Sequence, residues 1–274
     1  MNFIDPISQP EFPSPSLSPA PTAVERDEHA PVDLVDVLFI VIIAVGAFVF
    51  CGTVAAGIYW FTHRSLHLSQ EALSKALSRD ALYLVSLQLA AYLLVVGSMA
   101  LLAWGRHQAT LSRAISWNAP SARLAWYGVA GGLALALFSD IGDLFLERWI
   151  PKNLPITELF SDRRSAFLLA GFGILVAPLV EELLFRGFLY PAIARLAGAT
   201  TSIVITAILF TLLHGAQLGY SWAPLLLIFV VGATLTTIRA ATRSVALCVL
   251  VHMTYNFALL AQTFVATHGF RQMP

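Results

Sequence analysis

The chain has few charged residues for its length. Of its 274 residues, 12% are Asp, Glu, Lys or Arg, whereas 58% are hydrophobic. Soluble domains carry roughly twice that charged share and only about 45–50% apolar residues, so a soluble globular fold is excluded. Basic and acidic residues both number 16, and the formal net charge is zero. Because no general basic field exists to attract nucleic acid, nucleic-acid binding is excluded as well.

Cysteine is also scarce. Cys51 and Cys248 lie far apart inside apolar runs, without the spacing of a CxxC motif. We interpret both as packing residues.

The N-terminal segment lacks the basic region and short apolar core of a secretory signal, so no cleaved signal is expected there. Seven of the 14 prolines fall within residues 1–31. Such a stretch cannot bury enough apolar area to offset the entropy lost on ordering. Residues 1–34 are therefore predicted to form a disordered, Pro-rich tail.

Long apolar runs occupy most of the rest. A helix needs about 20 apolar residues to cross a hydrocarbon core of ~30 Å, and only helices and closed barrels satisfy their backbone there. We predict an all-α, polytopic transmembrane bundle of about seven spans. The predicted spans are Val35–Phe61, Ala81–Trp104, Leu124–Leu146, Ala166–Leu189, Thr200–His214, Trp222–Ile238 and Val245–Val265.

Two further features concern the membrane. Residues 62–80 alternate apolar and charged residues at helical spacing, which predicts an amphipathic helix on the membrane surface.

The number of Lys and Arg residues is equal on the two sides of the predicted spans, but the segments after the fourth and sixth spans are basic. This local bias favours a cytoplasmic position for Arg195, Arg239 and Arg243. No internal repeat is visible, so the inverted-repeat pattern of many transporters finds no support.

The fourth span contains charges that a simple span would exclude. Glu181, Glu182 and Arg186 interrupt an apolar run, and each central charge costs about 2.5–3.5 kcal/mol on the insertion scale. Glu182 and Arg186 are spaced for a salt bridge along one helix face. Glu181 lies about 100° further around the helix, where it can face a cavity. Pro178 should kink the helix just before the acids. The alternative is that the acids are interfacial and hold helices together through arginines.

Two other spans carry polar residues in matching pairs. Phe210 and His214 end the fifth span at i, i+4, and His252 and Asn256 stand at i, i+4 in the seventh. Taken alone, His214 could be an interfacial hydrogen-bonding group, and the second pair could join helices. Together with the glutamates, they supply a base, a site for water or metal, and donors for an oxyanion.

A third acidic group lies at the end of the third span. Asp140, Asp143 and Glu147 share one helix face, and Arg148 and Trp149 follow at once. We interpret this face as solvated and interfacial, with a cation or substrate site as the alternative.

The three polar motifs, EExxxR (Glu181 to Arg186), FxxxH (Phe210 to His214) and HxxxN (His252 to Asn256), follow one another in order. In this they resemble the CPBP family, also called the Abi domain. That family contains type II CaaX prenyl proteases and bacteriocin-processing or self-immunity proteins. The resemblance covers about residues 160–265 and implies a helical bundle with a buried catalytic cavity.

The resemblance also implies a mechanism, in which an activated water attacks the scissile carbonyl. Glu181 is then expected to act as general base, with His214 orienting the water. His252 and Asn256 would donate hydrogen bonds to the oxyanion, and Glu182 would orient the site from its pair with Arg186. Phe210 supports the site. In a second allocation, His214, His252 and a glutamate bind Zn²⁺, although the chain lacks an HExxH helix. We favour glutamate-activated water without a metal.

The expected organisation is a tail (1–34), N-terminal transmembrane helices (35–159), a protease core (160–265) and a C-terminal tail (266–274). We expect an intramembrane endopeptidase of the CaaX type in a bacterial inner membrane. Its partners would be the lipid bilayer and a membrane-associated peptide or protein, prenylated as in CaaX proteins or of another kind. The alternatives are a proton-coupled transporter and a non-catalytic immunity or scaffold protein.

Overall fold

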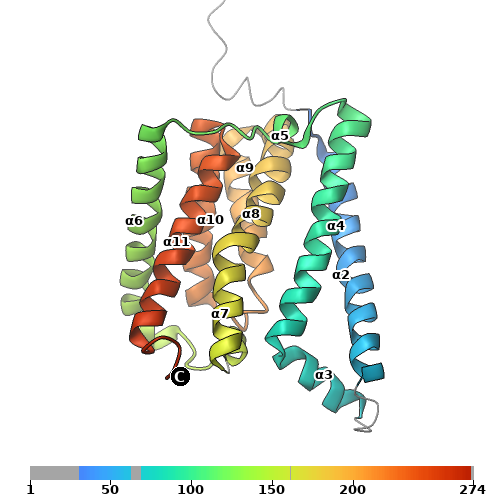
Figure 1. The fold of residues 1–274 in the computed structure, drawn as a ribbon. Coiled ribbons are helices and arrows are strands. Elements are labelled where there is room, and N and C mark those ends of the chain that lie inside the picture. The colour runs from blue at the N-terminus through green and yellow to red at the C-terminus, as the bar shows by residue number, and fades with distance from the viewer. Residues whose placement is uncertain (1–30, 63–68, 161, 273–274) are drawn as a thin grey trace, which may run out of the picture.

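A computed structural model describes residues 31–62, 69–160 and 162–272, and all regular secondary structure in these ranges is helical (Figure 1). The predicted tail, residues 1–34, falls almost entirely outside them. The helices are α2 Leu34–Thr62, α3 Gln70–Arg79, α4 Ala81–His107, α5 Leu111–Ala114, α6 Ala122–Leu146, η2 Glu147–Trp149, η3 Pro155–Phe160, α7 Arg163–Gly171, η4 Phe172–Val176, α8 Ala177–Glu182, η5 Leu183–Leu189, α9 Tyr190–Leu213, α10 Trp222–Thr242 and α11 Val245–Ala266. The segments η4 and η5 are π-helical.

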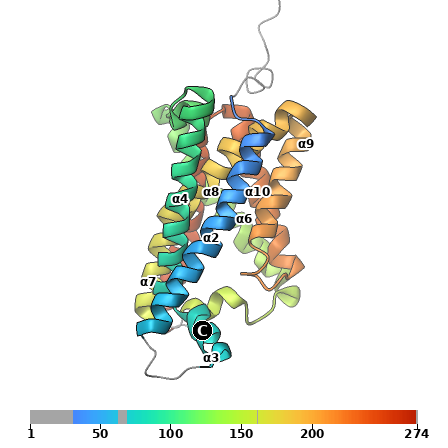
Figure 2. The same ribbon diagram turned by 90° about the vertical axis from the view of Figure 1, so that its right-hand side faces the viewer.

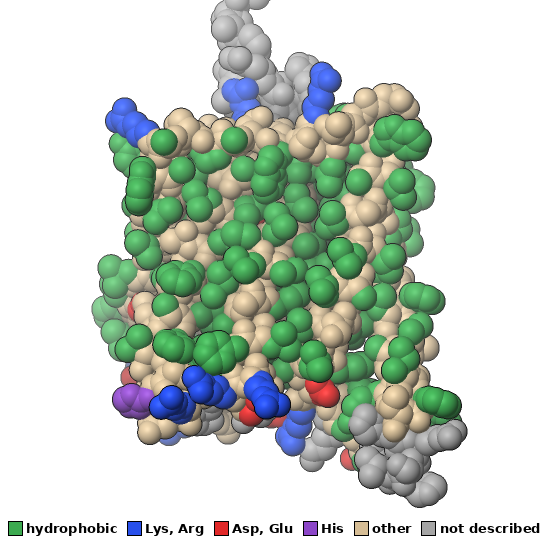
Figure 3. All heavy atoms as spheres, in the orientation of Figure 1, with side chains coloured by type: hydrophobic (Ala, Val, Ile, Leu, Met, Phe, Trp, Pro, Cys, Tyr) green, Lys and Arg blue, Asp and Glu red, His purple; other side chains and the backbone are tan. Residues whose placement is uncertain are grey.

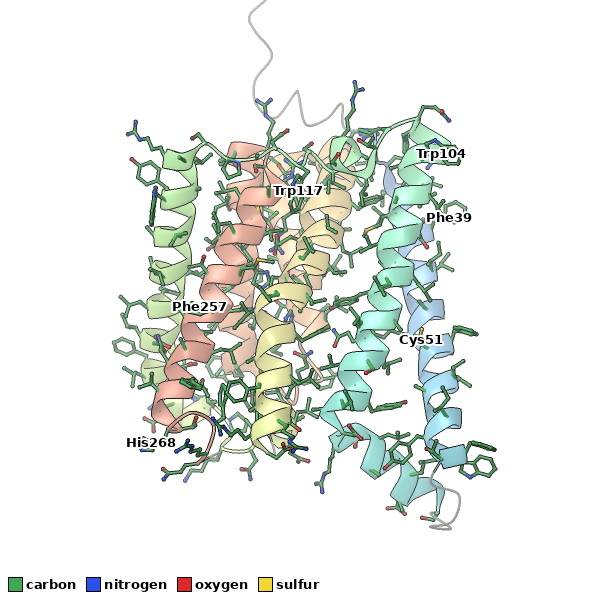
Figure 4. The ribbon with its side chains drawn as sticks, in the orientation of Figure 1. Phe39, Cys51, Trp104, Trp117, Phe257 and His268 are labelled. Carbon is green, nitrogen blue, oxygen red and sulfur yellow. The ribbon has the colours of Figure 1, made fainter. Side chains whose placement is uncertain are left out.

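Six helical stretches of the described chain are long and apolar enough to cross a membrane. Figure 3 shows a broad hydrophobic band across the face of the bundle that it presents, with charged side chains gathered at the two ends of this face. In Figure 4, Phe39 and Trp104 point outward from the bundle, and both are more than half exposed. Apolar side chains on the outside of a helix bundle need a lipid environment. The chain is therefore an integral membrane protein, as its composition predicts.

The stretch Arg163–Leu213, 51 residues long, contains both the fourth and the fifth predicted spans. It is bent back on itself at Gly198, whose φ of 77° and ψ of 167° are not helical. The hydroxyl of Ser202 donates to the carbonyl of Tyr190 over 2.8 Å, whereas these residues would lie about 18 Å apart along a straight helix. The stretch is thus a helical hairpin, and the bundle has seven helical legs, as predicted.

The legs pack in three close pairs, α2 with α4, α6 with α11, and α9 with α10. The run from α7 to η5 stands between them, in contact with α4 and α11 (Figures 1 and 2). Glycines allow α6 to approach α11, because a Cβ on Gly132 would lie 2.6 Å from the carbonyl oxygen of Val251. Small residues commonly permit such close packing between membrane helices.

The amphipathic helix predicted between the first two spans is present as α3, which lies at one end of the bundle (Figure 1). The hydroxyl of Ser69 caps it by accepting from the amide of Ala72. Residues 63–68 of the predicted helix fall outside the described chain.

One predicted loop residue proves to be buried. The sixth span was predicted to end at Ile238, but α10 continues to Thr242, and Arg239 is fully buried. Hydropathy alone places a charged residue outside a span, whereas Nε of this guanidinium donates to the carbonyl of Arg186 inside the bundle. The predicted end of the sixth span is therefore wrong, and the cytoplasmic side of Arg239 stays a prediction.

Candidate active site

Three of the predicted site residues, Glu181, Glu182 and Phe210, lie around the imidazole of His252. Glu182 and His252 are buried, and Nδ1 of His252 lies 2.8 Å from Oε1 of Glu182. The other ring nitrogen, Nε2, lies 3.9 Å from Oε2 of Glu181. Because a carboxylate only accepts hydrogen bonds, Nδ1 carries the proton of the shorter contact. The imidazole is thus fixed by Glu182 and directs Nε2 towards Glu181.

The predicted salt bridge between Glu182 and Arg186 is confirmed, with Nη1 of Arg186 2.9 Å from Oε1 of Glu182. The same buried guanidinium donates to α10 through Nη2 to the carbonyl of Gly232 and through Nε to the hydroxyl of Thr236. A buried ion pair is tolerated only when further hydrogen bonds satisfy both groups. Here α10 supplies them, and so holds the glutamate in place.

Glu181 is the more accessible of the two glutamates. Its side chain is 19% exposed, whereas that of Glu182 is fully buried. Tyr92 of α4 lies within electrostatic reach of Glu181. One carboxylate is therefore structural, and the other is open to a ligand.

Phe210 packs at the centre of the group. Its buried ring lies 4.7 Å from the ring of His214, 5.9 Å from that of His252 and 4.7 Å from the guanidinium carbon of Arg186. Nδ1 of His214 lies 2.8 Å from the carbonyl oxygen of Phe210, so that nitrogen donates. Phe210 thus packs against one residue of each of the three motifs, and its supporting role stays a prediction.

The distortion that Pro178 predicts is present as the π-helical segment η4. The amide of Ala177 donates to Phe172, five residues back, and at the next position Pro178 has no N–H to offer Gly173. The side chain of Asn256 donates to this carbonyl of Gly173 over 2.7 Å. One of the two amide protons of Asn256 therefore donates to the backbone on the N-terminal side of the glutamates.

The same arrangement recurs thirteen residues later. The amide of Tyr190 donates to Phe185, and Pro191 has no N–H for the carbonyl of Arg186. Nε of Arg239 donates to this carbonyl over 3.0 Å. The two glutamates of the EExxxR motif thus lie between two π-helical segments, and its arginine lies inside the second. A side chain from another helix completes each segment. The sequence did not predict that Arg239 completes this segment. Its only indication was a charged residue directly after an apolar run.

The buried catalytic cavity expected at the three motifs stays a prediction. A separate cavity of about 1040 Å³ lies at the far end of α6, and none of Glu181, Glu182, His214, His252 and Asn256 lines it. Access to the site is marked instead by the partly exposed side chain of Glu181.

The donor set does not fit the tentative zinc site in its present arrangement. Within residues 31–62, 69–160 and 162–272, no three His, Cys, Asp or Glu side chains are grouped so that they could hold a metal ion. In addition, Nδ1 of His214 and Nδ1 of His252 already have partners. The zinc assignment to His214 and His252 stays a prediction, and no catalytic step is derived from it.

A comparison with protein families gives the decisive observation. A family model described as type II CAAX prenyl endopeptidase, Rce1-like, matches residues 163–258. This segment begins at α7 and contains all three polar motifs, from Glu181 to Asn256. Over these residues the chain is similar to the CAAX protease family. Helices α2 to α6 lie outside the matched segment. No curated protein and no solved structure matches the chain.

Proposed function

We propose that this chain is a protease of the CAAX type, which hydrolyses a peptide bond of a membrane-associated substrate with a water activated by Glu181. The observation that carries the proposal is the placement of His252 between two carboxylates, one buried and one accessible. Glu182 fixes one ring nitrogen at 2.8 Å, and the other faces Glu181 at 3.9 Å. That second distance is too long for a direct hydrogen bond, but it suits a water bonded to both atoms at about 2.8 Å.

The proposed reaction begins when Glu181 accepts a proton from this water. The hydroxide attacks the scissile carbonyl carbon, and the carbonyl oxygen takes up the negative charge. Glu181 then gives the proton to the departing amine as the peptide bond breaks, which leaves a carboxylic acid and an amine. His214, held through Nδ1 by Phe210, presents Nε2 and orients the water.

Oxyanion stabilisation is assigned to His252 and Asn256. An imidazolium at His252 makes the group of Glu181, Glu182, Arg186 and His252 electrically neutral and gives Nε2 a proton to donate. Asn256 retains a second amide proton beside the one that Gly173 accepts. Donors that are fixed in advance are worth more than mobile ones, because they need no reorganisation during the reaction.

The substrate is proposed to be a membrane-associated peptide or protein, and the membrane a bacterial inner membrane. The family description supports a prenylated protein as one candidate substrate. Whether the reaction needs a metal is tested with active protein that has been treated with a chelator. Activity that survives with no metal bound excludes zinc, whereas activity that returns only with zinc excludes the metal-free mechanism.

The test is cleavage of a library of membrane-tethered peptides, some of them prenylated, by the purified full chain in liposomes. Glu181→Gln and His252→Asn are each expected to lower the turnover rate about 10²- to 10⁴-fold, as for other general acid–base groups. Glu71→Gln and His268→Asn are the matched controls, because both residues are exposed and distant from the motifs.

Each outcome separates the candidate functions. Loss of cleavage in the two site variants, with cleavage kept in the two controls, supports the proposal. Equal cleavage by all four variants contradicts the assigned site. A proton-coupled carrier would instead move protons across the liposome without cutting any peptide, and an immunity protein would only bind its partner.

A further inference from the structure

The cavity of about 1040 Å³ is a concave site separate from the candidate active site. It is lined by the ends of α6, α10 and α11 together with residues from 147 to 154 and Leu218, and it is partly open. In volume it reaches the upper end of the roughly 300–1000 Å³ typical of small-molecule sites. It is therefore large enough to hold a headgroup and part of an attached chain.

Its wall is apolar. Nine of the 15 lining residues are Leu, Ile or Pro, and they come from α6, α10, α11, the segment after η2 and the loop after α9. A wall of this kind favours hydrocarbon, since burying apolar surface gains about 25 cal/mol per Å².

Its rim carries four charges, those of Asp143, Glu147, Arg148 and Lys152. None of these side chains takes part in an ion pair within the described portion of the chain. Arg148 stacks on the ring of Trp149 at 3.6 Å, which fixes the position of its guanidinium. The rim thus offers two cations and two carboxylates that remain open to a ligand.

Two tryptophans set the depth of the rim. The rings of Trp149 and Trp222 pack edge to face at 5.5 Å, next to Arg148 and close to the start of α10. Tryptophan concentrates at the level of lipid headgroups. The charged rim therefore lies at headgroup depth, and the apolar wall lies beside the hydrocarbon.

The inner wall carries one further polar group. The buried hydroxyls of Ser139 and Tyr255 lie 3.2 Å apart, and both residues line the cavity. Two hydroxyls have two protons, and their mutual hydrogen bond uses one of them. The second proton is available to an acceptor between the headgroup and the chain.

We propose that this cavity binds one zwitterionic phospholipid. Its phosphate pairs with Arg148 and Lys152, its ammonium group with Asp143 and Glu147, and one acyl chain covers the apolar wall. An ester carbonyl accepts the free proton of the Ser139 and Tyr255 pair. A zwitterionic lipid fits best because opposite charges stand together on the rim. An anionic lipid would leave the two carboxylates unpaired, and an uncharged lipid would leave all four charges unpaired.

A lipid bound in the cavity would also affect the candidate active site. Tyr255 stands one residue before Asn256, and its ring lies 6.5 Å from that of His252. A lipid against Tyr255 thus supports the helix face that carries both site residues.

The test is native mass spectrometry of the full chain in detergent, with phosphatidylethanolamine, phosphatidylglycerol, diacylglycerol or inorganic phosphate added separately. This readout is independent of proteolysis, so its failure differs from failure of the proposed function. Phosphatidylethanolamine should bind saturably as a single copy, and at least about threefold more tightly than the other three probes.

Two variants and two matched controls locate the binding. Lys152→Glu reverses a rim charge and Ile228→Trp fills the cavity, and each should weaken binding about three- to fivefold or more. Arg164→Glu and Ile141→Trp make the same changes at exposed positions outside the cavity and should leave binding unchanged. Circular dichroism confirms that each variant is folded.

Several results would overturn the proposal. They are equal retention of phosphatidylglycerol or diacylglycerol, saturable binding of inorganic phosphate alone, or equal binding by cavity and control variants. Displacement of the lipid by a cleavable peptide would also overturn it, because the cavity would then belong to the substrate.

Discussion

Glu182 is the most constrained polar residue of the candidate site. It is fully buried, and its Oε1 accepts from Arg186 and lies 2.8 Å from Nδ1 of His252. Its Oε2 has no hydrogen-bond partner within the described residues. The charge of Glu182 therefore holds both a guanidinium and an imidazole, while Glu181 stays accessible.

Glu182→Gln is expected to destabilise the protein by about 3–5 kcal/mol, since it leaves the buried guanidinium of Arg186 without its counter-charge. The new NH₂ group must point either at the two donors that now bind Oε1 or into the present position of Oε2, which has no hydrogen-bond partner among the described residues. Unfolding in detergent measures the change.

The exposed control, Glu71→Gln, should shift the free energy of unfolding by no more than about 0.5 kcal/mol. A Glu182→Gln protein as stable as wild type would show that the ion pair does not hold the site.

At the scale of helices, the two π-helical segments set the geometry of the EExxxR motif. A proline follows each segment and has no N–H for the next hydrogen bond of the helix. One backbone carbonyl in each case therefore accepts from a side chain of another helix instead. Membrane helices tolerate proline where neighbouring groups satisfy the freed carbonyls. Asn256 and Arg239 do so here, which explains why polar groups of α10 and α11 lie inside the bundle.

Pro178 and Asn256 are therefore expected to be coupled. Asn256→Ala leaves the carbonyl of Gly173 without a donor and should cost about 1–3 kcal/mol of stability. Pro178→Ala restores an N–H five residues after Gly173, so the double variant should lose less stability than the sum of the single variants. A double-mutant cycle of unfolding free energies should give a coupling of about 0.5 kcal/mol or more. Strict additivity would mean that Asn256 has no backbone role.

For the whole molecule, the hairpin at Gly198 gives seven legs, so the two ends of the described chain lie at opposite ends of the bundle (Figure 1). In Figure 4, Trp104 lies near one end and His268 at the other. The loops at 119 and 200 share one end, and those at 216 and 268 share the other.

Single cysteines test this arrangement in a background without Cys51 and Cys248. Cysteines at Ala119 and Thr200 should react with a membrane-impermeant reagent from one side of a sealed vesicle. Cysteines at Ala216 and His268 should react from the opposite side. Labelling of Thr200 and Ala216 from the same side would contradict a membrane-crossing leg between them.

Much of this architecture follows from the sequence, because apolar length and the i, i+4 spacing of polar residues are local properties. The spans, the Glu182–Arg186 pair and the position of Phe210 were predicted in this way. The hydrogen bond from Asn256 to the backbone and the burial of Arg239 could not be predicted from the sequence. Both depend on which carbonyls the prolines leave without a donor, and on which helix packs beside those carbonyls. The cavity beside α6 likewise depends on packing between distant segments.

Glu181 is proposed to activate water and not to attack the substrate itself. A single turnover of a cleavable membrane-tethered peptide in water labelled with oxygen-18 distinguishes these two reactions. One labelled oxygen is expected in the new carboxyl group of the product, and none in the peptide that contains Glu181. Label in the side chain of Glu181 would contradict this proposal, because it would reveal a covalent acyl intermediate on that carboxylate.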